Sequence, residues 1–140
     1  MKKILLNSKI EMANLAREIA ALAQVGEVIC LQGTLGAGKS FFAKNFINSL
    51  QEEETEVLSP TFNLVYSYNT KKGEIFHFDL YRIKSALELE NIGFFEALKN
   101  GICLIEWPEI AADFLPKNRQ EIEIKIPTSE NEEAREVLFS

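Results

Sequence analysis

The fold of this chain is indicated most directly by the stretch Gly33-Thr34-Leu35-Gly36-Ala37-Gly38-Lys39-Ser40. It matches the pattern G-x-x-x-x-G-K-[ST] at every constrained position. Glycine tolerates positive φ angles, so successive backbone N–H groups of such a loop can turn towards one phosphate group. The lysine of the pattern can then reach the β- and γ-phosphates, and the serine hydroxyl can ligate Mg²⁺. The residues predicted to bind a nucleotide are Gly33, Leu35, Gly36, Ala37, Gly38, Lys39, Ser40 and Phe41.

The segments on either side of this loop support the prediction. Residues 27–32 before it form a short, mostly apolar run that is typical of a buried strand. Residues 41–50 after it carry apolar side chains at positions 41, 42, 43, 46, 47 and 50, which lie roughly on one face of a helix. A strand, a glycine-rich loop and a helix in this order are the expected context of a phosphate-binding loop.

Composition narrows the class of protein. The chain has 140 residues and 46% hydrophobic residues, which predicts one domain over residues 1–140 with one sizeable core. A net charge of −6 argues against a protein that grips nucleic acid on its own, because such binding depends on Lys and Arg. Cys30 and Cys103 lie in apolar runs and are expected to be buried, reduced thiols, as in a cytoplasmic protein. The apolar stretch at residues 4–6 is too short for a signal peptide, and no run is long enough to span a membrane.

Further elements follow from hydrophobic periodicity and capping residues. A helix from Ser8 to about Ala23 is expected to place Met12, Leu15, Ile19 and Leu22 on one face. We expect strands at 56–58, 101–106, 121–126 and 134–139, a hairpin formed by 63–68 and 74–78, and helices from 85 and over 93–100. The predicted fold is α/β: a single three-layer P-loop NTPase-type domain with a mixed, largely parallel sheet and an inserted antiparallel hairpin.

Two acidic residues at strand ends could complete a catalytic site. The apolar run 102–105 ends at Glu106, and the run 75–78 ends at Asp79. A phosphate-binding loop needs such a carboxylate to hold Mg²⁺ or its waters. Thr61 lies in the loop before the hairpin, where switch-type NTPases place a hydroxyl that senses Mg²⁺ and the γ-phosphate. The predicted catalytic residues are therefore Asp79, Glu106, Lys39 and Thr61, and the predicted Mg²⁺ ligands are Ser40 and Glu106.

Three further residues receive weaker interpretations. His77 is interpreted as a structural residue. Trp107 is interpreted as a packing residue, with stacking on a ligand or a partner as the alternative. Arg82 is the nearby cation that could act on the γ-phosphate.

Several segments together resemble one family. They are residues 33–40, Ser59-Pro60-Thr61-Phe62, His77-Phe78-Asp79-Leu80-Tyr81-Arg82 and Leu104-Ile105-Glu106-Trp107-Pro108-Glu109. The chain resembles the TsaE family, the small bacterial P-loop ATPases of tRNA threonylcarbamoyladenosine (t6A) biosynthesis, over roughly residues 8–126. The resemblance implies a cytoplasmic ATPase that uses ATP and Mg²⁺ and acts with the two protein subunits of the threonylcarbamoyl-transfer complex. These install threonylcarbamoyl on adenosine 37 of tRNAs that read ANN codons, and the tRNA would contact this chain only indirectly.

The resemblance also implies roles for individual residues. Lys39 and Ser40 correspond to the phosphate and Mg²⁺ residues, Glu106 to the Walker-B-like acid and Asp79 to the essential acid of the 77–82 segment. Thr34 departs from the family pattern, which usually has an acid there.

Two other classes of function stay open at this stage. A small P-loop kinase of metabolites or nucleosides would need a lid rich in Arg or Lys, and no such segment is present in the sequence. A non-enzymatic module whose nucleotide shapes an interaction surface is the other alternative. A GTPase is disfavoured because the sequence has no Asn-Lys-x-Asp motif.

Overall fold

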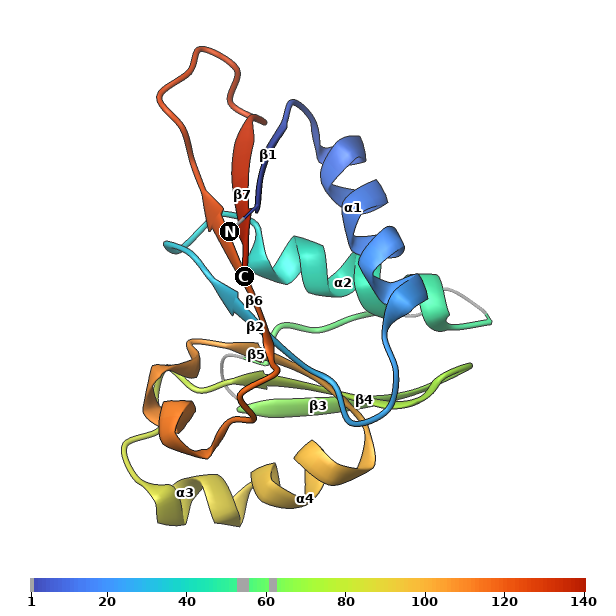
Figure 1. Ribbon diagram of the computed structural model, residues 1–140, viewed down its shortest axis with the longest axis vertical. Coiled ribbons are helices and arrows are strands. Elements are labelled where there is room, and N and C mark those ends of the chain that lie inside the picture. Colours follow the sequence, from blue (N-terminus) through green and yellow to red (C-terminus); the bar gives the residue numbers. More distant parts are fainter. Residues whose placement is uncertain (1, 53–55, 61–62) are drawn as a thin grey trace.

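The computed structural model describes residues 2–52, 56–60 and 63–140. Within these residues, seven strands form one sheet, and helices cover both of its faces (Figure 1). The elements in chain order are β1 (Lys2–Leu6), α1 (Lys9–Leu22), β2 (Val28–Gln32), α2 (Lys39–Leu50), β3 (Val65–Thr70), β4 (Gly73–Asp79), α3 (Ala86–Asn91), α4 (Phe94–Asn100), β5 (Ile102–Glu106), the 3₁₀ helix η1 (Pro108–Phe114), β6 (Gln120–Lys125) and β7 (Arg135–Phe139).

The sheet is parallel in its centre and antiparallel at its edges. The strand order is β1-β7-β6-β2-β5-β4-β3. Strand β2 pairs in parallel with β5 and β6, and β5 pairs in parallel with β4. The outer pairs β3/β4, β6/β7 and β1/β7 are antiparallel. The predicted mixed sheet with an antiparallel hairpin is therefore confirmed, and the carboxyl ends of β2, β4 and β5 meet at one edge.

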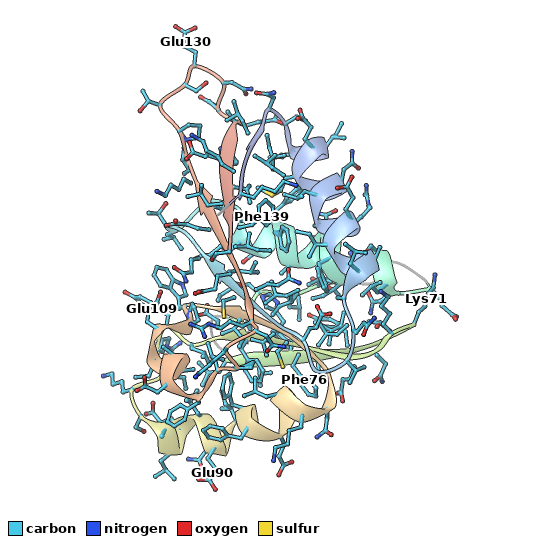
Figure 2. The ribbon with its side chains drawn as sticks, viewed as in Figure 1. Lys71, Phe76, Glu90, Glu109, Glu130 and Phe139 are labelled. Carbon is cyan, nitrogen blue, oxygen red and sulfur yellow. The ribbon has the colours of Figure 1, made fainter. Side chains whose placement is uncertain are left out.

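Two hydrophobic clusters fill the space between the three layers. The first lies between the sheet and helices α1 and α2, and the second lies between the sheet and α3, α4 and η1. Figure 2 shows the charged side chains of Lys71, Glu90 and Glu130 extending outward from the periphery, whereas Phe76 and Phe139 lie against the sheet. Since both faces are covered, β2 and β5 in the centre of the sheet are apolar along almost their whole length, as the sequence pattern predicted.

Several local predictions are confirmed. Ser8 and Ser85 cap α1 and α3, because their hydroxyls accept hydrogen bonds from the N–H groups of Glu11 at 3.2 Å and Glu88 at 3.3 Å. Cys30 and Cys103 are buried and free.

Other local predictions are wrong, for reasons that lie in tertiary contacts. Residues 56–58 are not a strand, and the Leu58 N–H donates to the Tyr68 hydroxyl at 3.1 Å instead of to a neighbouring strand. Leu22 is 78% exposed, because the buried stripe of α1 follows Met12, Ala16 and Ala20. The small alanines allow α1 to pack closely against α2.

Two elements were missed by the sequence analysis. Strand β1 forms where a short apolar start was noted, and it does so by pairing with β7 in the register Ile4↔Val137. Helix η1 follows β5 after Trp107. No helix in the described part of the chain combines the length and apolar character needed to cross a bilayer.

Candidate functional site

The loop between β2 and α2 is shaped by its glycines. Gly38 caps the start of α2 with a φ of 119°, in the left-handed region that side chains other than glycine rarely adopt. Its carbonyl accepts the N–H of Phe42 at 2.9 Å, the first bond of the helix. A Cβ at Gly33 would lie 2.5 Å from the backbone oxygen of Ile124, so the start of the loop fits closely against β6. The positive φ angle at Gly38 and the close approach at Gly33 are the physical reasons for glycine at these two positions.

Lys39 is folded back onto this loop. Its side chain is buried, with 5% of the residue exposed, and Nζ donates to the Gly33 carbonyl at 2.7 Å. The same Nζ lies 3.7 Å from the centre of the Trp107 ring, a cation–π contact. Burial lowers the pKa of the Lys39 ammonium from its usual value, and the carboxylates of Glu106, Asp79 and Glu109 oppose that shift.

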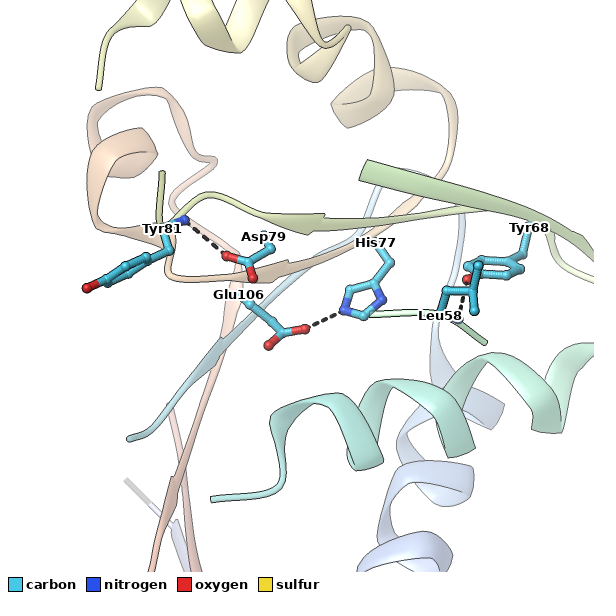
Figure 3. A network of polar contacts seen from close by, with 6 residues as sticks. All are labelled: Leu58, Tyr68, His77, Asp79, Tyr81 and Glu106. Atoms are coloured by element: carbon cyan, nitrogen blue, oxygen red, sulfur yellow. Dashed lines mark hydrogen bonds and ion pairs between the residues drawn. The ribbon is translucent and has the colours of Figure 1, made fainter. Parts of the chain in front are cut away.

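The two predicted acids end neighbouring parallel strands. Asp79 on β4 pairs in register with Glu106 on β5, so both side chains leave the same face of the sheet. They are buried, with 6% and 4% of each residue exposed. The Tyr81 N–H donates to Asp79 Oδ1 at 3.0 Å (Figure 3). The Leu80 N–H donates to the Glu106 carbonyl at 3.1 Å. The strand register thus places two carboxylates side by side at the edge beside the loop.

A buried histidine contacts one of these acids. His77 Nε2 lies 2.6 Å from Glu106 Oε2, and the two side chains are 1% and 5% exposed. His77 and Asp79 are two positions apart on β4, so they project from the same face of the sheet as Glu106 (Figure 3).

One cavity of about 240 Å³ brings the predicted residues together. The predicted site residues that line it come from the loop, from the start of α2 and from the ends of β4 and β5: Leu35, Gly36, Gly38, Lys39, Ser40, Phe41, Asp79 and Glu106. Two further lining residues, Ser59 and Trp107, were not assigned to the site by the sequence analysis. The two remaining predicted loop residues do not line this cavity. The Gly33 carbonyl accepts the hydrogen bond from Lys39 Nζ, and Ala37 lines a second cavity. Thr61 lies outside the described residues.

Trp107 was interpreted as a packing residue, with stacking on a ligand or a partner as the alternative, and it lines the loop cavity. It has a φ of 55°, a left-handed conformation that is uncommon for a large side chain. Its ring contacts Tyr81 at 5.0 Å between centroids, and Tyr81 is 69% exposed. The position directly after the Glu106 strand end was the available sequence signal.

Arg82 does not line this cavity. It lines a separate cavity of about 290 Å³ on the α3 side, together with Leu64, Ile83 and Glu88 among others. Among the described residues that line the loop cavity, Lys39 is the one with a positive charge. Arg82 is therefore not among the lining residues of the loop cavity, and its action on the γ-phosphate stays a prediction.

A second cavity, of about 230 Å³, adjoins the other side of the loop. Met12, Ala37 and Phe41 give it apolar walls, and Ser8 and Arg135 are among its polar lining residues. Arg135 Nε donates to the Ala37 carbonyl at 2.8 Å, which ties the loop to the start of β7.

The donor atoms in the loop cavity suit magnesium bound with phosphate. Mg²⁺ prefers oxygen ligands and usually retains several waters while one or two carboxylates and phosphates hold it. The Ser40 hydroxyl and the Glu106 carboxylate are such ligands, and both line the cavity. Over residues 2–52, 56–60 and 63–140, no three His, Cys, Asp or Glu side chains cluster closely enough to hold a metal ion.

Comparison with known proteins shows the family of the chain. Residues 6–137 match the family described as threonylcarbamoyl adenosine biosynthesis protein TsaE. The chain belongs to the TsaE family.

Individual TsaE proteins are similar over most of the chain. The tRNA threonylcarbamoyladenosine biosynthesis protein TsaE of Rickettsia prowazekii is 42% identical over 121 residues, which are 86% of this chain and 84% of that protein. The protein of the same name from Aquifex aeolicus is 38% identical over 133 residues, covering 89% and 96%. The crystal structure of YdiB from Bacillus subtilis superposes with a TM-score of 0.75 at 31% identity, covering 99% of this chain and 83% of that one. The three-layer α/β fold is thus shared with a solved structure.

Proposed function

We propose that this chain binds and hydrolyses ATP with Mg²⁺ as the ATPase subunit of t6A biosynthesis. The observation that carries the proposal is one cavity in which Lys39, Ser40, Asp79 and Glu106 meet beside a glycine-rich loop, in a member of the TsaE family. Neither feature alone is sufficient, because phosphate-binding loops serve many reactions.

Each polar residue of the cavity has a distinct proposed role. Lys39 exchanges its bond to the Gly33 carbonyl for the β- and γ-phosphates and balances their charge. The hydroxyl of Ser40 and the carboxylate of Glu106 hold Mg²⁺, which supplies charge stabilisation to the phosphates when it is bound. Asp79 orients a water molecule, since its carboxylate lies beside Glu106 and its Oδ1 is fixed by the Tyr81 N–H.

The second cavity is the proposed location of the nucleoside. It adjoins the loop through Gly36, Gly38 and Phe41, which line both cavities. Its mixture of apolar walls and polar groups suits a planar base with a sugar. The Arg135 bond to Ala37 would hold the loop while both cavities are filled.

Slow hydrolysis by the isolated chain is part of the proposal. Lys39 is the single cation among the described lining residues, and P-loop switches commonly gain transition-state stabilisation from a charge that a partner supplies. The proposed partners are the two protein subunits of the threonylcarbamoyl-transfer complex, which would modify adenosine 37 of tRNAs reading ANN codons in the cytoplasm. A net charge of −6 supports contact with tRNA through those partners.

Depletion of the protein in its source organism tests the proposal. Mass analysis of tRNA nucleosides should show loss of t6A, and an ATPase assay of the purified chain should show stimulation by the two partner subunits. Normal t6A in the absence of any second copy would overturn the proposal. ATP-dependent phosphorylation of a metabolite in a substrate screen would favour a kinase instead.

A further inference from the structure

We infer that His77 is a positioning residue that fixes the Glu106 carboxylate in the orientation needed to hold Mg²⁺. The inference rests on the proposed function, because it gives a second residue to the same magnesium site. It replaces the interpretation of His77 as a purely structural residue.

His77 lies behind Glu106 rather than in the cavity. Glu106 lines the cavity, whereas His77 is not among its lining residues and is 1% exposed. On the sheet His77 is in register with Leu104, and this pair lies two residues further from the strand ends than the pair Asp79 and Glu106. The imidazole therefore contacts Glu106 from the interior of the protein and does not itself line the cavity.

The contact leaves one carboxylate oxygen for the cavity. A carboxylate only accepts hydrogen bonds, so the Nε2–H of His77 donates to Glu106 Oε2 at 2.6 Å. The other oxygen points away from His77 (Figure 3). Mg²⁺ demands near-ideal octahedral geometry, and hydrogen bonds to a ligand from outside the coordination sphere orient that ligand. The bond thus selects one rotamer of a side chain that otherwise has several.

Packing alone does not account for a histidine at this position. The neighbouring side chains on the same face, Ile75 and Leu104, are apolar and fully buried. His77 Nδ1 is buried and has no hydrogen-bond partner within the described part of the chain. A buried polar atom without a partner destabilises the folded state, so an apolar residue would pack here at less cost. The stabilising contact that His77 does make is the one to Glu106.

Two amide variants separate positioning from packing. In His77→Gln the amide nitrogen lies about as far from Cβ as imidazole Nε2 and can still donate to Glu106. In His77→Asn the same amide is one methylene too short. His77→Leu removes the donor altogether, and Ile75→Val, on the same face of β4, controls for loss of core packing. Binding of Mn²⁺ is followed by electron paramagnetic resonance in the presence of the nonhydrolysable analogue AMP-PNP, and AMP-PNP binding is also measured without metal.

The Mn²⁺ affinity should fall about tenfold in His77→Asn and His77→Leu and stay within about threefold of the parent in His77→Gln and Ile75→Val. AMP-PNP affinity without metal should be unchanged in all of them. Equal Mn²⁺ affinities for the Gln and Asn variants would overturn the inference, even if His77→Leu fails to fold. A parent protein that binds no AMP-PNP would instead overturn the proposed function itself.

Discussion

The two faces of the sheet differ in what they bury. Among the described residues, four buried side chains are polar or charged: Lys39, His77, Asp79 and Glu106. The strand residues of this set project towards α1 and α2, and Lys39 begins α2. The cluster beneath α3, α4 and η1 is apolar throughout and rich in aromatic rings.

The same strands supply both faces. Alternate residues of a strand point to opposite sides, so β4 sends His77 and Asp79 to one face and Phe78 to the other. Strand β5 likewise sends Glu106 to the site and Cys103 to the apolar cluster. Burial on the apolar side raises the pKa of the Cys103 thiol to about 12, which keeps it protonated and inert at neutral pH. One face therefore provides packing that compensates for the charges buried on the other.

The largest expected effect on stability comes from the apolar face. The Phe94 ring is fully buried and lies 5.1 Å from the Phe78 ring and 5.7 Å from the Phe95 ring between centroids. Phe94→Ala should lower the free energy of unfolding by about 3–5 kcal/mol, because it removes these contacts and leaves a cavity. Urea denaturation measures the loss. Leu87→Ala on α3 is the control, since Leu87 is 65% exposed.

The affinity of folded Phe94→Ala for AMP-PNP should match that of the parent. If affinity falls together with stability at temperatures where the variant is folded, the two faces are not independent.

The largest expected effect on chemistry comes from Lys39. Lys39→Ala should lower the partner-stimulated ATPase rate by about 100-fold or more, because the β- and γ-phosphates lose their point charge. Its free energy of unfolding should fall by no more than about 1 kcal/mol, since burial of the ammonium opposes folding. Steady-state kinetics and urea denaturation give the two values. Lys44→Ala, an exposed position on the same helix, should leave both unchanged.

The two acids should separate by the step that each affects. Glu106→Ala should weaken Mg²⁺-dependent nucleotide binding by about tenfold or more, because the metal loses a ligand. Asp79→Ala should slow hydrolysis by about 100-fold with a smaller change in binding, because the attacking water loses its orienting group. Titration of ATP with and without Mg²⁺, followed by single-turnover hydrolysis, distinguishes the two. Parent-like hydrolysis in both variants would make these residues ordinary strand-end acids.

The sequence predicted the parts of the site that depend on local order. Gly33 to Ser40 are consecutive, so their spacing alone specifies a turn and the start of a helix. Asp79 and Glu106 were recognised as strand ends, but their side-by-side position depends on the register of β4 against β5. That register is determined by packing between segments 27 residues apart, which no local pattern records.

Three of the features that the sequence analysis missed or misassigned depend on contacts with other segments of the chain. His77 and Glu106 are 29 positions apart, so their hydrogen bond leaves no spacing motif. Strand β1 exists through its pairing with β7, at the other end of the chain. Residues 56–58 are apolar enough for a strand, yet Leu58 bonds to the Tyr68 hydroxyl instead. Element types were thus easier to predict than partners.

Lys72, a second lysine on the α1 side of the sheet, is expected to contribute to stability and not to ATP hydrolysis, the opposite of Lys39. Lys72, in the turn between β3 and β4, donates from Nζ to the carbonyls of Ala20 at 3.2 Å and Ala23 at 2.8 Å, and also to that of Ala21. These carbonyls lie at the C-terminal end of α1, where helix carbonyls run out of N–H partners, although the Ala20 carbonyl also accepts the N–H of the cap residue Ala23 at 3.2 Å. The last turn of α1 contains no basic residue of its own. An ammonium at this end also balances the negative end of the helix dipole.

Lys72→Met should therefore lower the free energy of unfolding by about 1–2 kcal/mol while leaving ATP hydrolysis unchanged, since Lys72 lies outside both cavities. Lys71→Met is the matched control, because Lys71 is exposed and its backbone N–H, which the substitution keeps, donates to the Leu50 carbonyl at 3.0 Å. Urea denaturation gives the stability change, and hydrogen exchange of the last turn of α1 should become faster in the Lys72 variant alone. Equal stabilities for the two variants would show that water molecules satisfy the carbonyls at the end of α1 as well as Lys72 does. A loss of stability confined to Lys72→Met would show that the Lys72 ammonium stabilises the fold by capping α1. Burial of a lysine ammonium would then oppose folding at Lys39 but not at Lys72.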